Sequence, residues 1–259
     1  MTIERTDDKL TGKLVTLSIE SESIACIQMR DETGKNALSE AFIEQLEKNL
    51  KQATEDLNIK VVLLIGLPTV FCSGADLKTL AALGKGDIQP VDIHLSKRLL
   101  DIPVPVIAAM EGHAVGGGLA LGLCADIAIL ASESRYGCSF MNMGFTPGMG
   151  ITKLMEHYMS PAVAHELLYT GVNKKGADLR DKTNINYILP KAEVLPMALQ
   201  IAHAIAEKSR DSLVLLKRYL SIPRRKLFEE TYSIESMMHD ITFNQSSILK
   251  SIKENYVRG

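Results

Sequence analysis

The chain of 259 residues contains no tryptophan, few aromatic residues and no excess of charge of one sign. Aromatic residues make up 5% of the sequence, and the formal net charge is -2. Nucleic-acid binding needs a basic face, and base stacking needs aromatic side chains. These absences argue against both kinds of surface, and we expect no nucleic-acid partner.

Long apolar runs and metal-binding patterns are absent as well. No stretch approaches the roughly 20 apolar residues of a membrane span, and segment 1–13 is polar and has no apolar signal core. The four cysteines have no CxxC spacing, and the histidines show no ligand pattern. We therefore expect a cytoplasmic protein with reduced, buried thiols, no membrane partner, no metal and no cofactor of its own.

The remaining sequence suits a large soluble core, with 46% hydrophobic and 23% charged residues. Strand-like runs at 14–20 and 23–30 predict a hairpin, followed by a helix after Ser39 and a buried strand at 60–65. This order predicts an α/β fold of repeated ββα units stacked as a spiral. We expect residues 1–200 to form this core with its site. Residues 201–259 would form a helical oligomerisation region.

Two stretches join a strand-like run to a helical pattern through small residues. One is FCSGADLK at 71–78, and the other is IAAMEGHAVGGGLALGLCAD at 107–126. A lone glycine triplet is typical of a tight turn or a close helix–strand contact. Two such turns, however, can each aim one free N–H group at a single oxygen. The pair therefore indicates an oxyanion hole for a thioester carbonyl.

These two motifs, followed by GFTPGMG at 144–150, resemble the crotonase superfamily, the enoyl-CoA hydratase/isomerase fold. The resemblance implies that the N–H groups of Ala75 and Gly117 are the oxyanion donors. Hydratases of the superfamily carry two catalytic glutamates, in patterns like GGGxE and FGxPE. This chain has Ala120 and Phe140 at those positions. Because no carboxylate pair is present there to activate water, hydration is not the expected reaction.

A smaller group within the superfamily is similar in FMNMGFTPGMG at 140–150, DSLVLLK at 211–217 and MMHDITF at 237–243. These are the enoyl-CoA hydratase-like decarboxylases of polyketide β-branching. The resemblance implies decarboxylation of a 3-methylglutaconyl thioester on an acyl carrier protein to a 3-methylcrotonyl-type thioester. It also implies assembly as a homotrimer or a dimer of trimers.

The same resemblance maps a catalytic lysine onto Lys78 and a catalytic histidine onto His239. In some members the lysine stands one position earlier, where this chain has Leu77. Lys78 would position the carboxylate and His239 would return a proton to carbon. A small set of apolar residues would line the substrate pocket and keep water away: Phe140, Ala120, Met141 and Phe145.

Other interpretations stay open. Lys78 equally suits a contact with the carrier or its phosphopantetheine, and a histidine beside methionines is often a packing residue. The fold also suits a double-bond isomerase acting on an acyl thioester. A non-catalytic protein that binds acyl carriers is a third hypothesis. It would explain the absent glutamates, but it gives no reason for two intact oxyanion turns.

Overall fold

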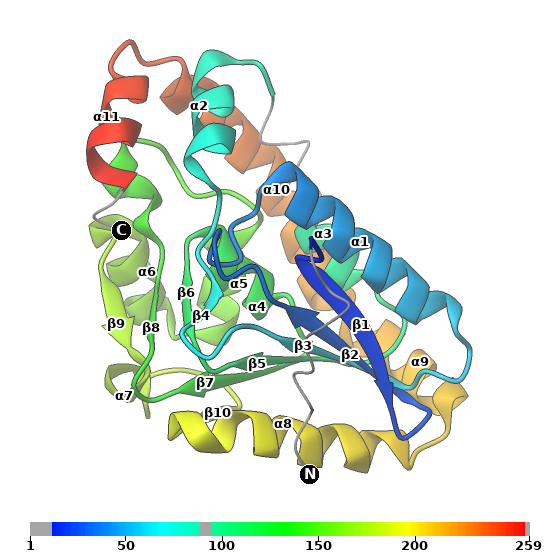
Figure 1. The fold of residues 1–259 in the computed structure, drawn as a ribbon. Helices are drawn as coiled ribbons and strands as arrows, with labels where there is room; N and C mark the ends of the chain where they lie inside the picture. Colours follow the sequence, from blue (N-terminus) through cyan, green and yellow to red (C-terminus); the bar gives the residue numbers. More distant parts are fainter. Residues whose placement is uncertain (1–11, 89–94, 257–259) are drawn as a thin grey trace.

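The computed structural model describes residues 12–88 and 95–256, which form two sheets surrounded by helices (Figure 1). The six-stranded sheet has the order β1-β2-β3-β5-β7-β10, and the four-stranded sheet has the order β4-β6-β8-β9. The strands of the larger sheet are β1 (Val15–Glu20), β2 (Ile24–Met29), β3 (Val61–Ile65), β5 (Val106–Met110), β7 (Ile127–Ala131) and β10 (Tyr187–Leu189). Those of the smaller sheet are β4 (Val70–Cys72), β6 (His113–Val115), β8 (Arg135–Gly137) and β9 (Asn173–Lys175).

The expected hairpin and the expected spiral are both present. Strands β1 and β2 pair antiparallel, and β2, β3, β5, β7 and β10 follow in parallel. In the pairs β3–β4, β5–β6 and β7–β8, the first strand joins the larger sheet and the second joins the smaller one. A helix follows each pair, so the ββα unit repeats along the chain and confirms the predicted fold class.

Within 12–88 and 95–256, α-helices and the 3-10 helix η2 connect and cover the sheets. They are α1 (Glu40–Glu55), α2 (Leu77–Lys85), α3 (Leu95–Leu100), α4 (Gly117–Leu123), η2 (Ser139–Met143), α5 (Ile151–Tyr158), α6 (Pro161–Thr170), α7 (Gly176–Leu179), α8 (Lys191–Ala206), α9 (Arg210–Leu220), α10 (Ile222–Phe243) and α11 (Ile248–Asn255). Ser39 caps α1 as expected, because its side chain accepts a hydrogen bond from the N–H of Phe42.

The larger sheet separates two hydrophobic cores. In β3, Val61, Leu63 and Ile65 pack in the core on the side of α8, whereas Val62 and Leu64 belong to the core on the other side. This alternation follows from the two-residue period of a strand, and full burial on both faces explains why β3 is an unbroken apolar run. Figure 1 shows α8 along one side of the sheet, with α4, α5 and α10 on the other side.

The sequence predicts helices at 191–208 and 211–220 and one helical tail over 226–256, and the structure has the first two but interrupts the tail. The boundary expected at residue 200 falls inside α8, which continues to Ala206. The expected helical tail from 226 to 256 is split into α10 and α11 between Phe243 and Ile248. A helical C-terminal region is therefore present, and its role in oligomerisation stays a prediction.

A buried cluster of charges fixes α9 and α10 to the core. Lys217 of α9 and Arg224 of α10 both donate hydrogen bonds to the carboxylate of Asp126, which also accepts from the N–H of Val106 at 2.8 Å. Arg224 also donates to the hydroxyl oxygen of Tyr158 at 2.6 Å. Because each charge has a partner, the cluster can be buried and can hold α10 across the core.

Within the described ranges 12–88 and 95–256, no helix has both the length and the apolar character that crossing a membrane requires. Most of the polar segment 1–13, on which the cytoplasmic expectation partly rests, lies outside the described residues. The expectation of free cysteines is confirmed, because Cys26, Cys72, Cys124 and Cys138 are all buried and unpaired.

Candidate active site

A cleft of about 780 Å³ opens where the two glycine-containing turns meet. Its lining includes Ala75 from the turn after β4 and Gly117 from the start of α4. Gly74, at φ +84°, brings these turns together: a Cβ there would lie 2.9 Å from the carbonyl oxygen of Val115 and 3.3 Å from the nitrogen of Gly117. Only glycine fits this spacing and this backbone conformation. The cleft thus contains both expected oxyanion turns.

The cleft continues into a smaller inner pocket. Five residues line both spaces: Ala75, Leu80, Gly117, Phe140 and Phe145. His239 lines the inner pocket but not the cleft. The other walls of the inner pocket are apolar side chains and one glycine: Leu38, Leu83, Gly148, Met149 and Phe243. An acyl group whose thioester oxygen is held between the two turns can therefore extend into an apolar space that ends at a histidine.

His239 has one free ring nitrogen. The side chain is 5% exposed, and its Nε2 lies 3.0 Å from the carbonyl oxygen of Thr146. Because a carbonyl only accepts hydrogen bonds, Nε2 carries the hydrogen. Nδ1 is buried and has no hydrogen-bond partner among the described residues. Burial lowers the pKa of His239, while the backbone carbonyls of Thr146 and Pro147 and the charge of Asp240 oppose that shift.

The structure does not bring Lys78 to the cleft or the inner pocket. Lys78 lies in the first turn of α2, where it is exposed and lines neither space. Leu80 and Leu83 form the inward face of this helix, and the helical period turns Lys78 away from them. Lys85, in the last turn of α2, instead lines a polar side pocket together with His239, Asp240 and Asn244.

The four apolar pocket candidates have different positions. Phe140 and Phe145 line both spaces, and their rings meet edge to face with centroids 5.9 Å apart. Met141 is 42% exposed and Ala120 is fully buried, and neither lines the cleft or the inner pocket. The three-residue period of η2 places Met143 on the face of Phe140 and turns Met141 outward. Met143 thus takes the place in the cleft expected for Met141.

Sequence reasoning missed a buried carboxylate beside the inner pocket. Glu235 of α10 is 2% exposed, and it accepts hydrogen bonds from the N–H of Gly150 at 2.6 Å and from the hydroxyl of Thr152 at 2.7 Å. Burial raises the pKa of Glu235, and these hydrogen bonds oppose the shift. The available signal was its spacing, because residues four apart share one face of a helix, here Glu235 and His239.

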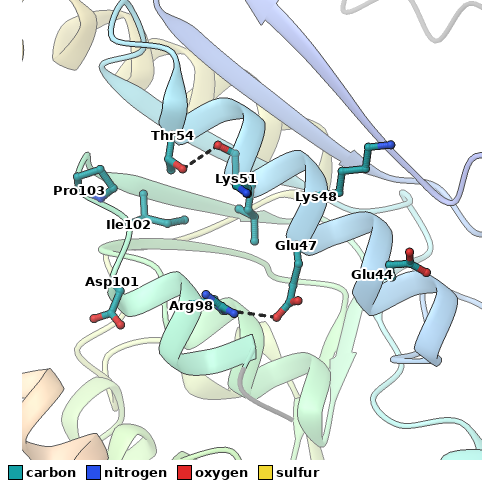
Figure 2. A pocket seen from close by; sticks show the side chains of 10 residues that line it. Glu44, Glu47, Lys48, Lys51, Thr54, Arg98, Asp101, Ile102 and Pro103 are labelled. Carbon is teal, nitrogen blue, oxygen red and sulfur yellow. Dashed lines mark hydrogen bonds and ion pairs between the residues drawn. The ribbon is translucent and has the colours of Figure 1, made fainter. Parts of the chain in front are cut away.

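A second large cavity lies between α1 and α3 (Figure 2). Its volume is about 530 Å³, and two of its charged side chains, Arg98 and Glu47, pair with each other at 3.6 Å. Figure 2 also shows Thr54 directed at the backbone of its own helix, where its hydroxyl donates to the carbonyl of Lys51 at 2.9 Å. The cavity contains neither oxyanion turn nor His239, so we place the candidate site in the cleft.

Other reactive groups offer no alternative chemistry in the site. Burial raises the pKa of Cys72, next to the first oxyanion turn, to about 12, so this thiol stays protonated at neutral pH. Asp76 caps α2 by accepting from the N–H of Thr79 at 2.7 Å, which is a structural role. Across 12–88 and 95–256, no three His, Cys, Asp or Glu side chains are grouped so that they could hold a metal ion.

Comparison with known proteins agrees with this geometry. Residues 19–257 match the enoyl-CoA hydratase/isomerase family. The bacillaene synthase decarboxylase PksI of Bacillus subtilis is 37% identical over 247 residues, which are 95% of this chain and 99% of that protein.

Two solved structures are similarly close. One is of a dehydratase/decarboxylase enzyme couple involved in polyketide β-branching; the matched chain has a TM-score of 0.90 and 37% identity, covering 94% of this chain and 99% of its own. The other is the ECH2 decarboxylase domain of CurF from Lyngbya majuscula, with a TM-score of 0.87 and 34% identity over 93% and 99% of the two chains. This chain belongs to the enoyl-CoA hydratase/isomerase family, the crotonase superfamily, and is homologous to its polyketide β-branching decarboxylases.

Proposed function

We propose that this protein decarboxylates a 3-methylglutaconyl-type thioester carried on the phosphopantetheine of an acyl carrier protein. The product is a 3-methylcrotonyl-type thioester. The observation that carries the proposal is that His239, whose Nδ1 has no hydrogen-bond partner among the described residues, lines an apolar pocket shared with Ala75 and Gly117. The likeness to decarboxylases over nearly the whole chain supports the same reaction.

The proposed reaction needs an electron sink and a proton donor. The bond between the carboxylate carbon and the adjacent methylene breaks, CO2 leaves, and the electron pair passes through the enoyl group to the thioester oxygen. The N–H groups of Ala75 and Gly117 stabilise the resulting dienolate where its charge develops. A proton is then added to the former methylene carbon, which completes the methyl group of the product.

His239 is the proposed proton donor. When the ring is protonated, Nε2–H remains bonded to the carbonyl of Thr146, so the second hydrogen on Nδ1 is the one available to the substrate. Solvent restores that proton after each turnover. The apolar walls around Phe140 and Phe145 support the reaction because they limit the access of water to the dienolate.

For the cation that holds the leaving carboxylate, we propose Lys85. Its support is position, because it lines the side pocket together with His239. Lys78 keeps the alternative expected from the sequence, a contact with the carrier or its phosphopantetheine, for which its exposure is suitable.

Paired variants test these assignments. We expect Lys85→Met to lower kcat about 100-fold, the scale for removal of a charged group that is used in the transition state. We expect Lys78→Met, the same change on the same helix, to alter only the KM for the carrier-bound substrate. The measurement is turnover by mass spectrometry of the acyl carrier protein. The reverse pattern would return the carboxylate-binding role to Lys78.

We also infer that the protein acts in the cytoplasm as a homotrimer. Two such trimers could pair as a dimer of trimers. Exposed apolar side chains gather on α9, where Leu216 is 55% and Tyr219 is 73% exposed, and on α10, where Met237 is 60% and Ile241 is 67% exposed. On each helix these residues are three or four apart and therefore share one face. Exposed apolar faces of this kind mark contact sites, and further copies of the chain are their proposed occupants. The free cysteines support a reducing compartment.

A further inference from the structure

We propose that Glu235 is a positioning residue: its carboxylate fixes the 146–150 loop against α10, and the loop in turn holds the ring of His239 with Nδ1 free for the substrate. The inference rests on the proposed role of His239. It adds a second residue that acts through the loop and does not touch the reacting atoms.

The carboxylate of Glu235 makes three hydrogen bonds, all to Gly150 and Thr152 at the start of α5. One oxygen of Glu235 accepts from the N–H of Gly150 at 2.6 Å. The other oxygen accepts from the N–H of Thr152 at 3.2 Å and from its hydroxyl at 2.7 Å. Gly150 precedes α5 and has no side chain to cap it, so Glu235 satisfies the start of α5 from another helix.

The 146–150 loop contacts His239 directly. The carbonyl of Thr146 accepts from Nε2 of His239. A Cβ at Gly148 would lie 2.5 Å from the ring carbon Cε1 of His239, so the ring packs directly on the loop backbone. Met149 has a φ of +65°, and its sulfur lies next to Gly117, 2.9 Å from where a Cβ of Gly117 would be. One short segment therefore contacts both the histidine and an oxyanion turn.

The three donors require a carboxylate at position 235. Three donors converge on Glu235, and a carboxylate has two oxygens that can accept from all of them. A glutamine has the same shape, but its NH2 group would face a backbone or hydroxyl donor. A buried donor would then lose its partner, which favours displacement of the loop.

A displaced loop changes the chemistry of His239. If the carbonyl of Thr146 moves away, Nε2–H loses its acceptor and the ring is no longer held in one tautomer. If the neutral ring carries its hydrogen on Nδ1, or if the ring rotates, Nδ1 is no longer the free nitrogen that takes up a proton and faces the substrate. Asp240 on the same helix acts on the charge of His239, and Lys85 of α2 lines the side pocket with it. Both are unchanged by the substitution.

Three variants and a matched control test the proposal. Glu235→Gln removes the charge and one acceptor, and Thr152→Val removes the hydroxyl donor while keeping the carboxylate. Thr152→Ser keeps that hydroxyl and should rescue the effect. Glu229→Gln makes the same chemical change at an exposed position of the same helix. The readouts are kcat and KM for the carrier-bound thioester and the tautomer of His239 from nitrogen-15 NMR.

We expect Glu235→Gln to lower kcat about 10-fold to 100-fold with little change in KM, since the misplaced group acts after binding. The NMR signals of His239 should change from the Nε2–H form to a mixture. Thr152→Val should give a smaller change in the same direction, and it remains a test if Glu235→Gln does not fold. Glu229→Gln and Thr152→Ser should match the wild type.

Two results would overturn the inference, and they are distinguishable from failure of the proposed function. The first is a lower melting temperature for Glu235→Gln with the tautomer and kcat of wild type, which would make Glu235 only a helix cap. The second is a normal tautomer and kcat in Thr152→Val when Glu235→Gln is unfolded. Full activity of His239→Gln would instead contradict the proposed function. The tautomer measurement needs no substrate, so it tests the role of Glu235 independently of the reaction.

Discussion

Replacing Gly118 with alanine should separate the two oxyanion turns. A Cβ at this position would lie 2.6 Å from the carbonyl carbon of Cys72 and 2.9 Å from its Cβ. The carbonyl belongs to the backbone of β4, so a change of rotamer cannot relieve the overlap with it. The carbonyl oxygen of Cys72 would be the atom nearest to the new Cβ. To bring the carbonyl carbon alone to the 3.4 Å of an ordinary contact takes a movement of about 0.8 Å, and the oxygen requires more. Because β4 leads into Ala75 and Gly117 precedes Gly118, the movement changes the spacing of the two N–H donors.

The expected loss is about 100-fold in kcat, because a misplacement of about 1 Å costs on that order and because loss of one oxyanion donor costs about 10²–10³-fold. This corresponds to about 2.7 kcal/mol of transition-state stabilisation. Overpacking should also lower the free energy of unfolding by about 1–3 kcal/mol. The assay is single-turnover loss of CO2, measured well below the melting temperature that circular dichroism gives for the variant.

Gly122→Ala is the matched control, since it makes the same change on the same helix. Its Cβ would overlap the sulfur of Met110 and lie 3.0 Å from its Cε; both atoms belong to a flexible side chain, which can move aside. Its kcat should therefore equal that of wild type. A folded Gly118→Ala protein with wild-type kcat would refute the argument that the spacing of these turns supports catalysis.

Three further predictions concern pH, assembly and stability. Burial lowers the pKa of His239, so if its protonated form is the donor, kcat/KM should rise as the pH falls and level off only below the ordinary pKa of about 6.5; a pH series should show this limb, and its persistence in His239→Gln would exclude His239 as its source. Leu216→Glu should reduce the mass of the assembly in multi-angle light scattering, and an unchanged mass would mean that α9 lies outside the interface. Lys217→Met should lower the free energy of unfolding in urea by about 2 kcal/mol, because Asp126 loses a buried partner but keeps Arg224; a loss below about 0.5 kcal/mol would show that the pair adds little.

The fold and the meeting of the two glycine-containing turns could be predicted from local patterns. The unbroken apolar run of β3 and the glycine triplet at the start of α4 each reflect constraints imposed by near neighbours. The break between α10 and α11 was not predicted, because the sequence from Asn244 to Ser247 contains no proline or glycine. The boundary expected at residue 200 falls inside α8 and stays a prediction, since helix periodicity does not show where one unit ends.

The walls of the site were less predictable than its turns. Lys78 follows the first turn closely in sequence, yet the helical period directs it outward. Met141 was misplaced because an apolar run gives no phase for a 3-10 helix. Glu235 binds the 146–150 loop, and its spacing of four residues from His239 is a signal in the sequence. Lys85 shares the side pocket with His239 through the tertiary fold alone, and no spacing along the chain indicates it.

The most direct test of the account is mass spectrometry of an acyl carrier protein that bears a 3-methylglutaconyl thioester, incubated with the purified protein. The account predicts loss of the mass of one CO2, at a rate that His239→Gln lowers by about 10²–10⁴-fold, the usual range for a general acid. A gain of the mass of one water would mean hydration and would contradict the argument from Ala120 and Phe140. An unchanged mass would contradict decarboxylation and leave isomerisation or carrier binding, which an assay of double-bond position separates.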